Sequence, residues 1–556
     1  MGRNRTFANP NQDLSPNPMK ARFVLLLMLL SIKFAYPQLF TESNLPIVIL
    51  NTDGASIPNE PKIPGTMKII DNGPGQINHT TDPGNVYDGN MGIEIRGHYS
   101  ASLPQKPYAI ETRDSQQNEL SVPLFGWPEE SDWVLLANYN DKVFMRNVLA
   151  FKLSNEAGFY ASRTKFVEVV LNGQYDGIYI FGEKLKRDDG RVNIAKLETG
   201  EISGEPLTGG YIFKVDYYDG SNSWLSPYHP IEHPSFDVHF VYYYPNPEDI
   251  VAQQRDYLKS FVTSFEAALY SPNFTDPVAG YRPFINSESF VNYFLVNELA
   301  RNNDGFKKSY FFHKNRDGID KRLNAGPVWD FDWAWKNIDE CPIFANTDGS
   351  GWAYQVNDCW PDINSPDWQV RLLQDPVFVN LTRCRWEEMK EDIMNKDSLF
   401  AWIDATTNYL WDAQERHYTR WPILGLNVGT PVIPPIPATF QGEINAFKHW
   451  IELRLAWLDA NIPGLCDPTN ITENTGLEPF IYPNPASEKV LVETTGSATS
   501  WYAKLFGMDG TLIAIRCIYA DSIISIDLQN IKPGMYLLRL ENSGSNAVIY
   551  KKLMVK

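Results

Sequence analysis

Three aspartates have the residue type and spacing to hold a metal ion and move a proton. Asp304 lies in a turn after a predicted helix, and Asp330 and Asp332 follow a strand-like run further along the chain. Mg²⁺ and Mn²⁺ take a few such carboxylates and leave other positions to substrate phosphates. A separate carboxylate can accept the proton of an attacking hydroxyl. The pattern indicates phosphoryl transfer, although local spacing alone also fits aspartates that only cap turns.

A lysine precedes these aspartates in an order typical of phosphotransferases. Lys214 lies midway along a predicted strand, ahead of Asp304 and Asp330. Protein kinases place a phosphate-pairing strand lysine, a catalytic aspartate and a metal-binding aspartate in that order. The chain has no G-x-G-x-x-G loop and no P-loop motif. The order of parts therefore favours a phosphotransferase without identifying one.

The elements that must position these residues lie between residues 39 and 466. Runs of the β type come first, two of them joined by Asn172-Gly173, and apolar residues at helical spacing come later. Strands are expected at 46–51, 92–96, 166–171, 177–181, 211–215 and 309–313, and helices at 254–270, 287–301 and 442–461. This order predicts an α+β domain.

The composition limits the class of protein. Of 556 residues, 43% are hydrophobic and 21% charged, which excludes a disordered or coiled-coil chain. The net charge of −18 repels phosphate backbones, so no nucleic-acid partner is expected, whereas divalent cations suit it. The five cysteines form no C-x-x-C pair, which argues against zinc. Cys341 and Cys359 are expected to form a disulfide if the chain is exported, the alternative being buried thiols.

The N-terminal region predicts export. Residues 19–22 carry positive charge and residues 23–32 are apolar, a pattern typical of a signal peptide and too short to span a bilayer. We expect residues 1–38 to be a mis-assigned extension plus a signal peptide, with Met19 as the true start; a buried N-terminal strand is the alternative. No other apolar run is long enough for a transmembrane segment.

A separate β module follows a polar linker at residues 467–477. Residues 478–556 show only short β runs between turns, which predicts a small all-β sandwich. Its motifs are YPNP at 482–485, a DG turn at 509–510, LQNIKPGMY at 528–536 and a lysine-rich last strand. The module resembles the type A C-terminal sorting domain of the type IX (Por) secretion system. The resemblance implies that the type IX secretion machinery is a partner. It also implies passage across the outer membrane of a Gram-negative bacterium, followed by release or surface attachment. The alternative is an ordinary carbohydrate-binding or immunoglobulin-like sandwich.

An ordered set of motifs carries a second resemblance, over residues from about 90 to 460. The set is IRGHYS at 95–100, KPY at 106–108, residues 133–147, LNG at 171–173, GIY at 177–179, GGYIFK at 209–214, Asn303-Asp304 and GPVWDFD at 326–332. The segment resembles the CotH kinase family, the spore-coat-protein-H-like atypical kinases. The resemblance implies a distant protein-kinase-like fold that uses ATP with Mg²⁺ or Mn²⁺ to phosphorylate proteins.

The resemblance implies roles around the metal. Asp304 matches the catalytic aspartate and Asp330 the metal-binding aspartate of a WDxD motif, in which Asp332 is a second candidate ligand. Many family members carry Lys-Asn just after the catalytic turn, where this chain has Lys308-Ser309. A serine hydroxyl is a weaker ligand than an amide oxygen. Ser309 therefore indicates either reliance on the two aspartates or reduced activity.

The resemblance also suggests residues for the nucleotide. Lys214 is the candidate that pairs with phosphates, and Arg96 and Glu183 are candidate polar groups of the nucleotide pocket. Arg96 could instead cap a sheet edge, and Glu183 could face solvent. Asp141 and Arg146 are expected to form a buried structural pair.

Two other functions fit the same sequence. A catalytically inert surface protein could use the fold to bind partners or Ca²⁺, as in adhesion. A metal-dependent nucleotide-sugar transferase could use Asp330 and Asp332 as its clamp. We predict a secreted CotH-like kinase whose protein substrate is unknown and keep both alternatives.

Overall fold

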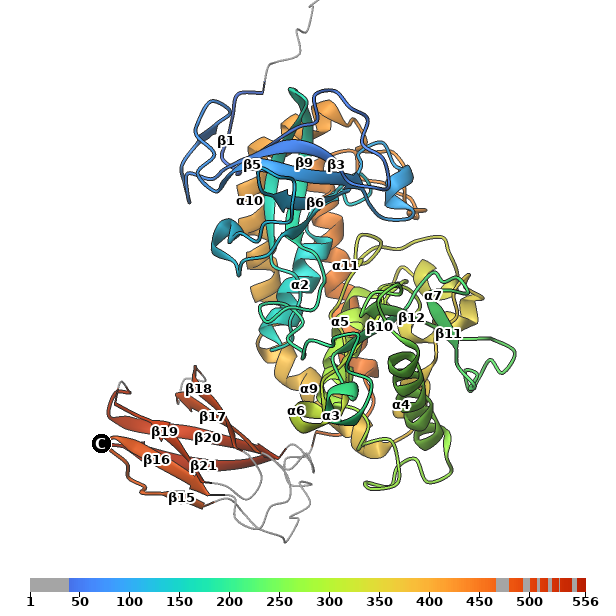
Figure 1. Ribbon diagram of the computed structural model, residues 1–556, viewed down its shortest axis with the longest axis vertical. Helices are drawn as coiled ribbons and strands as arrows, with labels where there is room; N and C mark the ends of the chain where they lie inside the picture. The colour runs from blue at the N-terminus through green and yellow to red at the C-terminus, as the bar shows by residue number, and fades with distance from the viewer. Residues whose placement is uncertain are drawn as a thin grey trace, which may run out of the picture.

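The computed structural model describes residues 40–466, 480–493, 501–507, 511–518, 523–529, 531–542 and 548–556. The predicted signal peptide, the linker at 467–477 and the turn at 509–510 lie outside the described residues. Figure 1 shows a β-rich part at the top, a helical part below it and a separate β module formed by the C-terminal residues. Within the described residues, no helix combines the length and apolar character needed to cross a bilayer.

The first part is a closed β-barrel, here called the barrel lobe. Its strands follow the order β2-β3-β5-β6-β7-β9-β8, and β2 closes the barrel by pairing in parallel with β8. The bounds are β2 Ile47–Asn51, β3 Ile63–Ile70, β5 Tyr87–Ile95, β6 Tyr108–Arg113, β7 Asp132–Ala137, β8 Thr164–Leu171 and β9 Gln174–Glu183. The β8–β9 hairpin turns at Asn172 and Gly173, both with positive φ, as the sequence predicts. Every strand expected in this region is confirmed, but closure into a barrel was not predicted.

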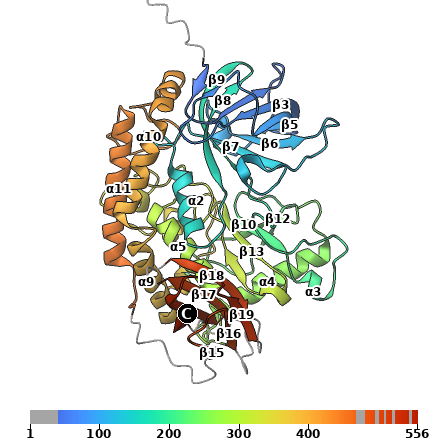
Figure 2. The same cartoon turned by 90° about the vertical axis from the view of Figure 1, so that its left-hand side faces the viewer.

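The second part, here called the helical lobe, combines a five-stranded antiparallel sheet with long helices. The sheet has the order β11-β12-β10-β13-β14. Its strands are β10 Tyr211–Val215, β11 Ser223–Leu225, β12 His239–Tyr244, β13 Tyr310–Lys314 and β14 Leu323–Ala325. The long helices are α4 Ala252–Tyr270, α5 Ser287–Ala300, α9 Pro376–Glu391, α10 Lys396–Arg420 and α11 Phe440–Asn461. In Figure 2, α10 and α11 run along one side of both lobes, and α10 packs against β9 while α11 packs against α5.

Helix α5 is the centre of the helical lobe. The sequence predicts one apolar face, but all its residues except Glu288 are buried, including Asn292 and Asn297. A helix surrounded by other elements is buried all round rather than along one stripe. Its burial fixes the turn that follows, which contains Asp304.

Short elements connect these parts. They are β1 Glu42–Ser43, β4 Asn78–His79, α2 Arg146–Glu156, α3 Gly204–Leu207, α6 Asp317–Asp320, α7 Pro342–Ala345 and α8 Trp368–Leu372, with 3-10 turns at Ser100–Ser102, Leu124–Gly126 and Ala353–Cys359. The strand-like run expected just before Asp330, residues 325–329, is not a strand: β14 ends at Ala325, and the chain then runs as a loop to Asp330.

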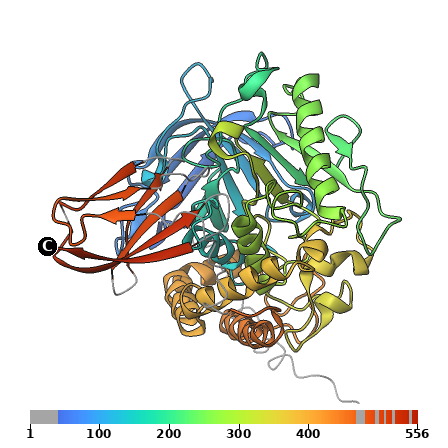
Figure 3. The ribbon, with the colours of Figure 1, turned by 90° about the horizontal axis from the view of Figure 1, so that it is seen from below.

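The C-terminal module is an all-β sandwich, as predicted. One sheet has the order β15-β16-β19 and the other β18-β17-β20-β21. The bounds are β15 Phe480–Tyr482, β16 Lys489–Glu493, β17 Trp501–Gly507, β18 Leu512–Ile518, β19 Ile523–Asp527, β20 Gly534–Asn542 and β21 Val548–Val555. Inward residues such as Val490, Leu505 and Leu538 form its own core. Figure 3 shows the module beside the rest of the chain when the molecule is seen from below.

Two disulfides join segments of the helical lobe. The predicted pair Cys341–Cys359 is confirmed, with a Cα–Cα distance of 5.6 Å. A second bond, Cys384–Cys466, ties α9 to the segment after α11. The sequence allowed for a second disulfide but did not specify its partners.

Candidate active site

A cleft of about 820 Å³ lies where the barrel lobe meets the helical lobe. The barrel lobe contributes side chains at the ends of β5 and β9, and the helical lobe contributes β10 and the loops around α5 and β14. Six of the seven residues that the sequence singled out line this cleft: Arg96, Lys214, Asp304, Ser309, Asp330 and Asp332. The fold therefore brings together residues that are far apart in the sequence.

The loop carrying Asp330 and Asp332 is fastened by side-chain amides. The Phe331 amide donates to Asn147 Oδ1 at the start of α2 (2.8 Å), and Asn302 Nδ2 donates to the Asp330 carbonyl (3.1 Å). Asp330 has a φ of 58°, a left-handed conformation that is costly for a residue other than glycine. These contacts hold the carboxylate in a backbone conformation that it would otherwise rarely adopt.

The two carboxylates of this loop meet neutral donors. Ser309 Oγ donates to Asp330 Oδ2 and Asn140 Nδ2 donates to Asp332 Oδ2, each at 2.6 Å. Burial raises the pKa of Asp330 to about 7, and the neighbouring Asp332 carboxylate adds to the effect. Burial also raises the pKa of Asp332. Two buried acids so close together, one of which raises the pKa of the other, favour a cation between or beside them.

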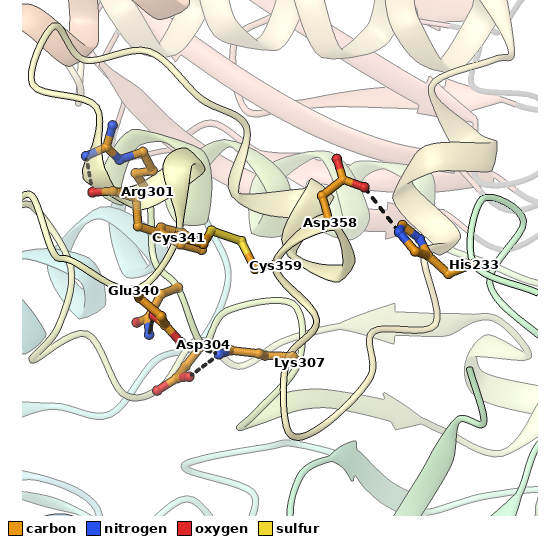
Figure 4. The surroundings of a disulfide bond; sticks show 10 residues. His233, Arg301, Asp304, Lys307, Glu340, Cys341, Asp358 and Cys359 are labelled. Carbon is orange, nitrogen blue, oxygen red and sulfur yellow. Dashed lines mark hydrogen bonds and ion pairs between the residues drawn. A yellow bond between two sulfur atoms is a disulfide. The ribbon is translucent and has the colours of Figure 1, made fainter. Parts of the chain in front are cut away.

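Asp304 lies in the turn that follows α5. Arg301 ends the helix in the left-handed conformation, and the Asp304 carbonyl accepts from the amides of Lys307 and Lys308. The Lys307 ammonium lies 3.5 Å from Asp304 Oδ1 and 3.1 Å from Glu340 Oε1, as Figure 4 shows. Burial raises the pKa of Asp304 to about 6, although both lysines oppose the shift.

Two cations face these acids across the cleft. The Arg96 guanidinium stacks over the Trp329 ring at 5.4 Å, and burial lowers the pKa of Arg96 against the attraction of Asp330. Lys214 Nζ lies 2.5 Å from Asp216 Oδ2. Arg96 has no side-chain hydrogen-bond partner among the residues described, so its donors are available to an anionic ligand.

Residues 93–458 match the family described as CotH kinase protein. The chain belongs to the CotH kinase family. Residues 480–556 match the secretion system C-terminal sorting domain, so this CotH protein is exported by type IX secretion, to the cell surface or the medium. No curated protein matches the chain.

One site residue expected for this CotH protein lies elsewhere. Glu183 is fully buried at the end of β9, where its carboxylate accepts from the Arg163 guanidinium at 2.6 Å and the Tyr160 hydroxyl at 3.2 Å. It does not line the cleft, whereas the next residue, Lys184, does. Neighbouring residues of a strand point to opposite faces, so the structure places the Glu183 carboxylate away from the cleft and away from solvent.

The predicted Asp141–Arg146 pair is a buried ion pair that also supports the site. The Asp141 carboxylate accepts from the Arg146 guanidinium and from the Arg146 amide, and Arg146 Nε donates to the carbonyl of Ala334. The pair thus joins the start of α2 to the loop just beyond Asp332.

Sequence reasoning missed several cleft residues. Asp216 could have been predicted, because it stands two positions after Lys214, just past the end of β10, and extended chain places such residues on the same side. Glu340 and Asp362 come from loops without any periodic pattern, and no local signal marks them.

The donor set limits the kind of metal that could bind. No group of three or more His, Cys, Asp or Glu side chains that could hold a metal ion occurs within the described residues. An all-protein cage of the Ca²⁺ or Zn²⁺ type is therefore not formed there. Asp330 and Asp332 fit an ion that takes one or two carboxylates and completes its shell with phosphate oxygens and water, as Mg²⁺ does.

Proposed function

We propose that this CotH protein transfers the γ-phosphoryl group of ATP to protein hydroxyls, with Mg²⁺ or Mn²⁺. The observation that carries the proposal is the meeting of three carboxylates, those of Asp304, Asp330 and Asp332, with Arg96 and Lys214 in one cleft. Phosphoryl transfer needs mainly positioning and electrostatic stabilisation, which such an arrangement can supply.

Asp330 and Asp332 would hold the metal, which when bound neutralises charge on the phosphates. The Asn140 and Ser309 donors fix the orientation of the two carboxylates before any ligand arrives. The left-handed backbone at Asp330 further restricts the orientation of the Asp330 carboxylate. A preorganised pair of acids loses little freedom when a cation binds.

Asp304 would orient the acceptor hydroxyl and take its proton. A pKa of about 6 leaves most of this carboxylate ionised at neutral pH and still able to hold a proton briefly. Lys307 and Lys308 follow in the same turn and stabilise its charged form.

Arg96 and Lys214 would contact the phosphates. Arg96 presents donors in a fixed planar fork that suits phosphate oxygens, and the Trp329 ring holds its plane. Lys214 pairs with Asp216, which keeps the ammonium at the cleft wall. The cleft volume of about 820 Å³ has room for a nucleotide and part of an acceptor.

The test uses the full-length chain, γ-labelled ATP and either Mg²⁺ or Mn²⁺, with casein as a generic acceptor. Label on the chain or the acceptor should be lost in Asp304→Asn and in Asp330→Asn. Asp412→Asn, an exposed position on α10 far from the cleft lining, is the matched control and should keep the wild-type rate.

The same experiment separates the alternatives. Absence of label together with absence of an ATP-dependent rise in melting temperature would support an inert surface protein that binds partners. A larger thermal shift with a nucleotide sugar than with ATP would support a glycosyl transfer site built on Asp330 and Asp332.

A further inference from the structure

The turn that contains Asp304, here called the catalytic turn, is held from two sides by residues of the cleft wall. On one side, Glu340 accepts from Asn303 Nδ2 at 2.8 Å and pairs with Lys307 at 3.1 Å. On the other side, Asp362 pairs with Lys308 at 2.9 Å and accepts from the Tyr217 hydroxyl at 3.0 Å. The two lysines that follow Asp304 in this turn are thus each held by a carboxylate from the segment 340–362.

The Cys341–Cys359 disulfide joins the two ends of that segment. Cys341 directly follows Glu340 and is joined to Cys359 (Figure 4). Cys359 itself lies just before Trp360 and Asp362 in the cleft lining. Trp360 has a left-handed φ of 53° and is 74% exposed, with its ring in edge contact with Phe236. A covalent link at this place therefore restrains both carboxylates at once.

The middle of the segment has anchors of its own. Arg301 donates to the carbonyls of Asn346 and Ser350, and the amides of Ala353 and Tyr354 donate to Glu298 on α5. Loss of the disulfide should therefore free the two ends that reach the cleft without unfolding the lobe. The consequence would be a local displacement of Lys307, Lys308 and the turn that contains them and Asp304.

We infer that the Cys341–Cys359 disulfide is a positioning element of the active site and that phosphoryl transfer requires it to be formed. This inference rests on the proposed kinase function. One cysteine thiolate attacks an external disulfide, the other displaces the external thiol, and the two protein thiols thereby lose two electrons and two protons to a dithiol product. Because a reducing cytoplasm keeps thiols reduced, the chain would become active only after export.

The first experiment compares oxidised and reduced full-length chain. Dithiothreitol followed by alkylation should lower kcat at least about tenfold, since small misplacements at a reacting centre are costly. The KM for ATP should stay within about twofold, because Arg96 and Lys214 make no contact with the segment, and a merely structural role would not produce this split. Reoxidation before alkylation should restore kcat.

The variants separate this disulfide from the other one. Cys341→Ser with Cys359→Ser should have low kcat that no longer responds to dithiothreitol. Cys384→Ser with Cys466→Ser, which removes the disulfide between α9 and the end of the lobe, should keep kcat and remain sensitive to reduction. Melting temperatures report whether each variant is folded, and reduction of the wild type needs no variant at all.

Three results would count against the inference. Unchanged kcat in chain whose Cys341 and Cys359 are both alkylated overturns it and leaves the kinase proposal intact. An equal loss of kcat in the Cys384–Cys466 control assigns the effect to general stability and also overturns it. No label from the oxidised wild type overturns the kinase proposal, and this inference falls with it.

Discussion

Buried carboxylates in two regions of the molecule have opposite surroundings. Outside the cleft, Glu168 accepts from both Nε and Nη2 of Arg416, and Glu183 accepts from Arg163. Inside the cleft, Asp330 and Asp332 accept only from Ser309 and Asn140, as the described residues show. The first group joins β8 to α10 and β9 to the chain before β8. No described residue forms an ion pair with Asp330 or Asp332, and Arg96 and Lys336 attract them only from a greater distance.

The difference separates buried acids whose charge is neutralised inside the protein from buried acids whose charge a bound ligand would neutralise. A buried carboxylate paired with arginine recovers part of its desolvation cost, and it becomes destabilising only when the partner is removed. A buried carboxylate that is not paired with a cation has a raised pKa, because burial disfavours its charged form. When it is ionised, it lowers the free energy of unfolding. Clusters of such groups persist mainly where a ligand supplies the missing charge.

The largest expected effect separates activity from stability at Asp330. Asp330→Asn should lower phosphoryl transfer about a hundredfold or more, because it removes a metal-binding carboxylate. The same change should leave the melting temperature equal or higher, because it removes a buried acid whose pKa is raised to about 7. Paired kinetic assays and thermal melts above pH 7 check both parts; a large fall in melting temperature would mean that Asp330 is structural.

At Glu183 we expect a loss of stability without a change in nucleotide binding, the opposite of the result expected at Asp330. Glu183→Gln removes the carboxylate 3.8 Å from Arg191, a guanidinium that is almost completely buried. The free energy of unfolding should fall by about 3–5 kcal/mol, as for other broken buried pairs. Urea denaturation measures this loss, and the KM for ATP of the folded fraction should not change.

Lys184→Gln, one residue along and on the cleft side, is the matched control for Glu183. It should leave the urea midpoint nearly unchanged, since the Lys184 side chain is 39% exposed. If Glu183→Gln instead raised the KM for ATP without loss of stability, its carboxylate would belong to the nucleotide site after all.

The sequence predicted much of this architecture because the signals are local. Period-two runs identify β8 and β9, their Asn-Gly turn identifies the hairpin, and the order of Lys214, Asp304 and Asp330 indicates the chemistry. The all-β sandwich was predictable for the same reason, since short alternating runs between turns are visible without tertiary information.

The rest depends on contacts that the sequence does not encode locally. Strand β9 is buried on both faces from Gly177 onward, so no alternation shows that Lys184 rather than Glu183 faces the cleft. Closure of the barrel depends on the parallel pairing of β2 with β8, more than a hundred residues later. Glu340 reaches the catalytic turn from an irregular loop, directly before Cys341 of the Cys341–Cys359 disulfide.

Glu266, a buried acid in the helical lobe that lies outside the cleft, extends this comparison of paired and unpaired acids. Glu266 is buried away from the cleft, accepts from Ser226 Oγ at 2.7 Å and Trp368 Nε1 at 3.1 Å, and burial raises its pKa to about 7. Its contribution to stability is therefore fully present below about pH 4.5 and is lost as the pH rises through about 7. Glu266→Gln should remove this loss.

The expected size follows from the shift in the pKa of Glu266. At pH 8 the variant should be more stable than the wild type by about 1–3 kcal/mol, and near pH 5 the two should be similar. Urea midpoints at several pH values measure the difference. An identical pH profile for both proteins would show that Glu266 is ionised in the folded state and that an unpaired buried acid need not cost stability.

The smallest expected effect concerns Ser309, the residue that departs from the family pattern. Ser309 has a φ of 47°, a left-handed conformation that asparagine tolerates better than serine, and its hydroxyl faces Asp330. Ser309→Asn should relieve this strain and add an amide oxygen near the metal. We expect the Mg²⁺ concentration for half-maximal activity to fall a few-fold, with a gain in stability of a few tenths of a kcal/mol. Activity titrated against Mg²⁺ measures the first change and thermal melts the second. A higher Mg²⁺ requirement would mean that the hydrogen bond from Ser309 to Asp330 matters more than an added ligand, and that orientation of the carboxylate limits this site.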